Sequence, residues 1–205
     1  MTSLTATPSD VAFSPAVKAV QEEKGSRELF ANMEAGRPWS DRLTPDLAQF
    51  IAMQTSLFLG TASAAGQPYI QHRGGPAGFM QVLGEKQLGF ADFAGNRQYI
   101  TLGNLSENPK ATLFLIDYER GVRVKLWGTA RVVENDPGLV ARLRVEGGRG
   151  RPERAILFDL AAWDANCPQH IPQRIDGARV ASLLAERDAR IAALQAEIAD
   201  LKGER

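Results

Sequence analysis

Two arginines, each set among glycines or amides, are the residues of this 205-residue chain most suited to ligand chemistry. Arg73 follows an apolar run and precedes two glycines, and Arg97 stands between Asn96 and Gln98. A guanidinium group offers charge and paired donors that match phosphate oxygens, and glycines let backbone N–H groups approach the same anion. Apolar runs beside both arginines could shelter a flat ring. The pattern predicts a site for a phosphorylated aromatic cofactor.

Other interpretations of these residues compete with this one. Each arginine alone is also typical of a solvated strand end, and only their similar settings favour a shared anion. The glycines are not followed by the Lys-Ser/Thr of a Walker loop, and no Gly-x-Gly-x-x-Gly opens a helix. Cys167 and His170 lie close in sequence, but no orienting group or oxyanion loop accompanies them. No catalytic residue is assigned.

Composition excludes several classes of function. Lys and Arg number 24 and Asp and Glu number 24, so no net field would recruit nucleic acid or anionic lipid. Cys167 is the only cysteine, and the two histidines stand in no ligand-spaced cluster, so no metal site is expected. Residues 1–10 lack the features of a signal peptide, and the most apolar stretch, 50–65, is too interrupted to span a bilayer. We expect a cytoplasmic protein without membrane or nucleic-acid partners.

The expected elements are short strands with helices at the periphery. Ser14 and Pro15 predict a helix over 14–35, a second short helix runs from Thr44 to about 53, and a third covers about 136–145. Because turns rather than helices separate the strands, an antiparallel barrel or Greek-key sheet is favoured over a parallel fold. The expected strands are 55–63, 69–72, 79–83, 87–93, 111–117, 122–133 and 155–163.

The tail from about residue 176 has a different pattern. Apolar residues occupy the a and d positions of a short heptad repeat, with Arg187 at one d position. The sequence leaves open whether this helix pairs with itself or with another protein. The apolar positions are Leu184, Ile191, Leu194, Ile198 and Leu201.

Five segments together resemble the pyridoxamine 5′-phosphate oxidase-like, FMN-binding split-barrel family, in its bacterial branch of predicted flavin-nucleotide-binding proteins. They are 73–79, 95–99, 103–109, 126–130 and 166–172. The resemblance covers about 13–175 and implies a mainly β, six-stranded antiparallel Greek-key split barrel with peripheral helices. It also implies a homodimer with FMN at the subunit interface. The expected domains are an N-terminal helical segment (1–45), the FMN-binding barrel (46–175) and a C-terminal amphipathic helix (176–205).

The resemblance also implies roles for single residues. Arg73 matches a phosphate-binding arginine, and Arg97 with Gln98 matches the segment that completes the phosphate site. Arg123 falls where the family places a polar side chain near the flavin, and Trp163 and Arg174 match residues that close the site. The complete set of expected cofactor contacts is Arg73, Gly74, Gly75, Asn96, Arg97, Gln98, Arg123, Trp163, His170 and Arg174.

Two departures from the oxidase pattern bear on function. Gly78 stands where the oxidase has a lysine, and Gln169-His170-Ile171 replaces its Arg-x-His substrate motif. These departures favour FMN binding, with an unassigned substrate or electron donor, over pyridoxamine phosphate oxidation. The expected function is that of a flavin-dependent oxidoreductase. Two alternatives stay open: a non-catalytic flavin-binding or sensory module whose tail recruits a partner, and a split barrel that binds haem or a deazaflavin.

Overall fold

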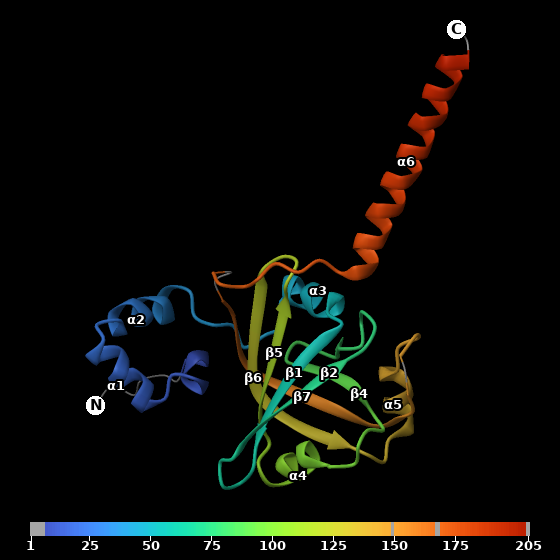
Figure 1. Cartoon of the computed structure of the whole chain (residues 1–205). Coiled ribbons are helices and arrows are strands. Elements are labelled where there is room, and N and C mark those ends of the chain that lie inside the picture. The colour runs from blue at the N-terminus through green and yellow to red at the C-terminus, as the bar shows by residue number, and fades with distance from the viewer. Residues whose placement is uncertain (1–6, 149, 167–168, 204–205) are drawn as a thin grey trace. The chain divides into compact units, whose positions relative to one another are not determined.

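The computed structural model describes residues 7–148, 150–166 and 169–203 (Figure 1). The chain divides into two compact units, which are described separately. The first contains the N-terminal helices and nearly all of the β-sheet, and the second contains Asp117–Val122 and the C-terminal helix. Cys167, considered above beside His170, lies outside the described residues. The domain boundaries expected from the sequence stay a prediction.

The N-terminal part forms short helices with polar caps: η1 (Pro8–Val11), α1 (Pro15–Glu23), α2 (Arg27–Gly36) and α3 (Pro45–Met53). The Ser14 hydroxyl accepts a hydrogen bond from the Val17 N–H of α1, and Thr44 caps α3 in the same way. The single helix expected over 14–35 is wrong, because the chain breaks between α1 and α2. Gly25 lies there with a φ of +72°, a left-handed conformation that ends a helix readily only at glycine.

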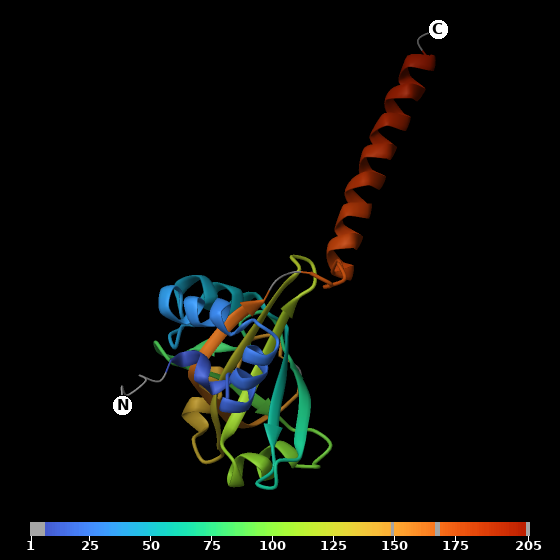
Figure 2. The ribbon, with the colours of Figure 1, turned by 90° about the vertical axis from the view of Figure 1, so that its left-hand side faces the viewer.

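Aromatic contacts join the N-terminal segment to the sheet, whose ribbon Figure 2 shows from a second side. The Phe13 ring lies 5.2 Å from that of Phe30 and 5.0 Å from that of Trp39, measured between centroids. Trp39 in turn stacks on Trp127 of the sheet, with centroids 4.8 Å apart and planes 10° from parallel. Offset aromatic pairs of this kind contribute stability beyond the apolar area that they bury.

Among the described residues the sheet has seven strands in the order β2-β1-β5-β6-β7-β4-β3, with antiparallel pairing along β1–β2, β1–β5, β6–β7, β4–β7 and β3–β4. The antiparallel, mainly β architecture agrees with expectation, although the family resemblance implies six strands rather than seven. Strand β3 falls within the expected strand 79–83, but it has only two residues and pairs with β4 across a turn. The strands are β1 (Ser56–Ala62), β2 (Pro68–Gly74), β3 (Gln81–Val82), β4 (Gln87–Phe93), β5 (Lys110–Asp117), β6 (Val122–Val133) and β7 (Pro152–Asn166).

The sheet curls back on itself. Arg73 of β2 forms an ion pair with Asp92 of β4, although four other strands separate β2 and β4 in the sheet order. Only a closed or nearly closed sheet brings these two strands into contact. Leucines, phenylalanines and isoleucines from five strands fill the interior with at most 1 % of their surface exposed: Leu57, Leu59, Leu88, Phe90, Leu113, Leu115, Leu126, Ile156 and Phe158.

Two features shape the sheet near its middle. The pairing of β6 and β7 shifts by one residue between Trp127 and Gly128, and a Cβ atom at Gly128 would overlap the Asp159 carbonyl oxygen. Glycine is therefore required where the two strands approach so closely.

Two short helices complete this unit, α4 (Ile100–Glu107) between β4 and β5, and α5 (Pro137–Leu143) between β6 and β7.

The second unit consists of the connection between β5 and β6 and the chain around α6 (Gly177–Gly203). The Arg174 guanidinium lies over the Tyr118 ring, 4.3 Å from its centroid, and Arg179 of α6 pairs with Glu119. No residue of α6 is buried among the described residues, and its apolar side chains are 39 % to 61 % exposed. No described helix is both long and apolar enough to cross a membrane.

Candidate functional site

Strand β2 presents three polar side chains on one face. Successive side chains of a strand point to opposite faces, so Tyr69, Gln71 and Arg73 lie on the same side and are half-buried. His72, between the last two, faces the other way, and its Nε2 lies 2.7 Å from the Ser56 hydroxyl. The alternation of β2 thus selects which residues of this segment reach the site.

The loop between β4 and α4 provides the facing wall. The Asn96 side-chain oxygen accepts a hydrogen bond from the Gln98 N–H at 3.2 Å, which folds the loop into a tight turn. Arg97 and Tyr99 both have positive φ, at 61° and 53°. Such a conformation is uncommon away from glycine, and strain of this kind clusters at ligand sites.

Helix α4 is fixed against β1 and β2 by two side-chain hydrogen bonds. The Thr101 hydroxyl donates to the Gln71 side-chain oxygen at 2.8 Å, and the Asn104 amide donates to the buried Thr61 hydroxyl at 3.0 Å. This docking points the first turn of α4 at the same space as the β2 side chains. The first N–H groups of a helix have no intrahelical acceptor and carry partial positive charge.

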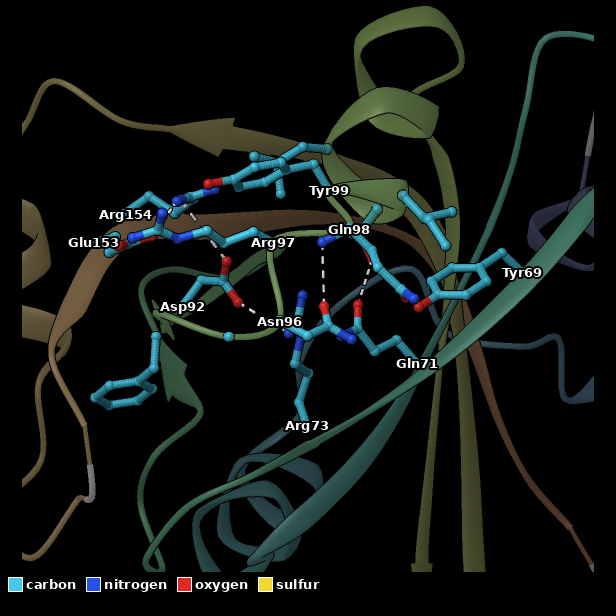
Figure 3. A pocket seen from close by; sticks show the side chains of 15 residues that line it. Tyr69, Gln71, Arg73, Asp92, Asn96, Arg97, Gln98, Tyr99, Glu153 and Arg154 are labelled. Carbon is cyan, nitrogen blue, oxygen red and sulfur yellow. Dashed lines mark hydrogen bonds and ion pairs between the residues drawn. The ribbon is translucent and has the colours of Figure 1, made fainter.

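These segments enclose a pocket of about 230 Å³ (Figure 3). Its walls come from β2, the end of β4, the 95–99 loop, the start of α4 and the beginning of β7. The residues that line it are Tyr69, Gln71, Arg73, Asp92, Phe93, Gly95, Asn96, Arg97, Gln98, Tyr99, Ile100, Thr101, Leu102, Glu153 and Arg154.

Three arginines and two acids share the pocket. Arg73 Nη1 lies 3.1 Å from Asp92 Oδ1, and Arg154 Nε lies 3.9 Å from Asp92 Oδ2. Arg154 also pairs with Glu153 and packs over the Tyr99 ring, 5.5 Å from its centroid. Burial of Asp92 raises the pKa of its carboxyl, an effect that the two nearby guanidinium groups oppose. The arrangement can bind an anion that has several oxygens.

Comparison with known sequences identifies the family. Residues 43–166 match the sequence model described as pyridoxamine 5′-phosphate oxidase, which covers more than half of the chain. The chain belongs to the pyridoxamine 5′-phosphate oxidase family. No curated protein sequence matches the chain at a significant level.

Solved structures that resemble the chain are distant from it in sequence. HupZ of Group A Streptococcus is 19 % identical, with 64 % of this chain and 98 % of that chain covered and a TM-score of 0.49. A putative pyridoxamine 5′-phosphate oxidase of Lactobacillus delbrueckii is 20 % identical, with 61 % and 95 % covered and a TM-score of 0.46. An FMN-binding protein of Syntrophomonas wolfei is 12 % identical, with 72 % and 97 % covered and a TM-score of 0.45.

The structure brings together four of the residues expected to contact a cofactor in this pyridoxamine 5′-phosphate oxidase family member. Arg73, Asn96, Arg97 and Gln98 line one pocket although they come from two segments. Gly74 and Gly75 follow Arg73 but are not among the lining residues. The close packing of Phe79 explains Gly75, because a Cβ atom there would lie 2.6 Å from Phe79 Cβ.

The other four expected contacts are not among the residues that line this pocket. Trp163 belongs to β7, where its indole N–H donates to the Arg42 carbonyl at 2.8 Å. Arg123 lies on β6 opposite Asn166. His170 and Arg174 belong to the second compact unit. A role for these four residues at the cofactor stays a prediction.

Several pocket residues are not among those that the sequence predicts. Tyr69 and Gln71 have a usable signal, because they alternate with Arg73 along a strand. Asp92 is the one acid of β4, whose other residues after Gln87 are apolar, and this also marks it. Arg154 has no comparable signal, since its position opposite Asp92 depends on the register of β4 and β7.

Proposed function

We propose that the chain binds FMN and holds its phosphate in the pocket lined by Arg73 and Arg97. The observation that supports this most is convergence: both arginines, with Asn96 and Gln98, reach one cavity from separate segments. A phosphomonoester carries close to two negative charges at neutral pH and accepts several hydrogen bonds. Paired guanidinium groups match that anion in charge and geometry.

Two observations on the pocket fit a bound phosphate. The Nε of Arg73 is buried and has no hydrogen-bond partner within the described part of the chain. Buried donors are almost always satisfied, so an orphaned one beside a cavity is a place for an acceptor. The first turn of α4 borders the same cavity, and helix N-termini favour anions.

The size of the pocket supports a site completed by a second subunit. Sites for ligands of drug-like size enclose about 300–1,000 Å³, and this pocket measures about 230 Å³. One chain therefore offers room for the phosphate end of FMN rather than for the whole molecule. We propose a homodimer in which the partner subunit covers the flavin ring.

The proposed reaction class is flavin-dependent oxidoreduction of a small molecule. Bound FMN would supply hydride and electron transfer, while the residues of this chain bind and orient it. Arg73, Arg97 and Gln98 would fix the phosphate, and Thr101 would hold Gln71 in place through its hydrogen bond. The substrate and the electron donor are left unassigned.

Replacement of each arginine tests the phosphate assignment. A charge-assisted hydrogen bond contributes about 1.5–3 kcal/mol, so Arg73→Ala and Arg97→Ala should each weaken FMN binding by about one to two orders of magnitude. Riboflavin lacks the phosphate and should bind each variant as it binds the parent. Arg131→Ala, at an exposed arginine of β6, is the matched control. Unchanged FMN affinity in both pocket variants would refute the assignment.

Absorption spectroscopy of the purified protein tests the identity of the cofactor. Flavin bands are expected, whereas a Soret band would indicate haem and a deazaflavin spectrum would indicate that third ligand. Anaerobic addition of NADH or NADPH then tests for turnover. Bleaching of the flavin bands supports an oxidoreductase, and a flavin that neither nucleotide reduces supports a non-catalytic binding module.

A further inference from the structure

Asp92 and Arg154 form a charged pair inside the pocket for which the proposed function gives no role. The two residues lie directly opposite each other on β4 and β7. Asp92 is 6 % exposed, and the side chain of Arg154 is 9 % exposed. Figure 3 shows the Asp92 carboxylate between the guanidinium groups of Arg73 and Arg154. Charged groups are rarely buried this deeply unless they are paired.

The hydrogen bonds of this cluster are incomplete. Within the described part of the chain, the buried Arg73 Nε, Arg154 Nε and Asp92 Oδ1 have no hydrogen-bond partner. The contacts of 3.1 Å and 3.9 Å to Asp92 are therefore ion pairs without well-aligned hydrogen bonds. Each of the two arginines keeps a buried Nε–H donor that makes no hydrogen bond within the described residues. A ligand that brings several oxygens could satisfy both donors at once.

The carboxylate is also poorly stabilised where it lies. Desolvation is the largest influence on Asp92 and raises the pKa of its carboxyl in spite of Arg73 and Arg154, and the nearby Glu153 carboxylate raises it further. Burial thus disfavours the ionised form of Asp92 relative to its protonated form.

We propose that Asp92 is the internal counter-ion of the anion site. It holds Arg73 and Arg154 in the ligand-free chain, and a phosphomonoester takes its place on both guanidinium groups. Arg154 then becomes a third phosphate-binding arginine, beside Arg73 and Arg97. This inference rests on the proposed phosphate site and adds a competitor to it. Because Asp92 and the phosphate are both negative, Asp92 lowers the affinity of the pocket for its ligand.

A purely structural role for Asp92 predicts the opposite result. If Asp92 only fixes the two arginines in a binding geometry, its removal should weaken phosphate binding. If Asp92 competes with the phosphate, its neutral isostere should strengthen binding. The sign of the change in affinity therefore separates the two roles.

The test compares Asp92→Asn with the parent protein. A charge within about 4–6 Å shifts an ionisation equilibrium by about 1–3 pH units, so removal of the Asp92 charge should tighten FMN binding by about tenfold. The affinity for inorganic phosphate, measured by competition with FMN and by thermal shift, should rise in parallel. Riboflavin affinity should not change. Weaker binding of FMN and phosphate by Asp92→Asn, or an unchanged affinity, would overturn the inference.

The matched control is Glu134→Gln. Glu134 Oε1 lies 3.7 Å from Arg154 Nε, but its side chain is 60 % exposed and lies outside the residues that line the pocket. The substitution Glu134→Gln removes one negative charge beside the same guanidinium group, but on its solvent side. FMN affinity should therefore change less than about twofold. A tightening as large as that of Asp92→Asn would mean that net charge alone explains the result, which also overturns the inference.

A second comparison does not require that Asp92→Asn folds by itself. The double variant Asp92→Asn/Arg154→Gln removes one negative and one positive charge, so the net charge of the cluster stays that of the parent. It should bind FMN more tightly than Arg154→Gln alone, and the reverse order contradicts the inference. If the proposed function itself is wrong, the parent protein should bind FMN no more tightly than it binds riboflavin. Inorganic phosphate binding to the parent and Asp92→Asn still decides the role of Asp92 in that case.

Discussion

At the scale of residues, the pocket depends on an unusual balance of burial and charge at Asp92. The carboxyl is buried, so its pKa is raised, although Arg73 and Arg154 act in the opposite direction. A carboxyl that binds its proton more tightly in the folded state favours folding most at low pH. Its contribution is lost as the pH rises from the ordinary value of about 3.8 through the raised pKa of the folded state.

This balance predicts a pH-dependent difference between the parent and Asp92→Asn. The free energy of unfolding of the parent, minus that of Asp92→Asn, should fall as the pH rises above about 4. The slope for one proton is at most about 1.4 kcal/mol per pH unit. Urea unfolding of both ligand-free proteins at several pH values measures it. A difference that rises with pH would show that the arginines outweigh burial and lower the pKa of Asp92.

The residues of the pocket differ in how far the sequence predicts them. Arg73 and Arg97 stand beside glycines and amides, and this local composition is enough to indicate an anion site. Asp92 and Arg154 depend on the pairing of β4 with β7, whose strands are about sixty residues apart in sequence. No local pattern encodes that register, so the competing carboxylate and the third arginine emerge only from the fold.

At the scale of elements, helix α4 is the clearest omission from the sequence-based prediction. Its sequence, ITLGNLSE, contains glycine, asparagine and serine, which are weak helix formers. Its start has a left-handed Tyr99 and no side-chain cap, so the usual start signal is also missing. Tertiary contacts to β1 and β2 stabilise the helix instead. The long alternating strands, in contrast, carry their own signal, and the sequence predicts them within a few residues.

Replacement of Asn104 tests this account of α4. Asn104→Ala leaves the buried Thr61 hydroxyl without its partner, which should destabilise the fold by about 1–3 kcal/mol. Ser106→Ala, at an exposed residue of the same helix, is the control and should change stability by less than about 0.5 kcal/mol. Urea unfolding measures both. Equal effects of the two substitutions would mean that α4 does not depend on its contact with β1.

At the scale of the whole molecule, α6 lies outside the part of the chain that matches the family. The family match ends at residue 166, and the helix begins at Gly177. Its apolar residues at heptad positions are exposed, and about three heptads are too few to stabilise a long isolated helix in water. We therefore propose that Ile191, Leu194 and Ile198 pack on a partner surface, most simply the same helix of a second subunit. Arg187 at a seam position would weaken that pairing.

Deletion of residues 178–205 tests whether the barrel or the helix α6 forms the main contact between two subunits. If the barrel forms the main dimer interface, the shortened protein should stay folded, dimeric and able to bind FMN, with a thermal midpoint a few degrees lower. Arg187→Leu in the full chain should raise the midpoint, because it fills the seam with an apolar side chain. Light scattering and calorimetry measure these outcomes. A shortened protein that is monomeric and binds no flavin would show instead that α6 assembles the cofactor site, and the barrels then meet only because their tails pair.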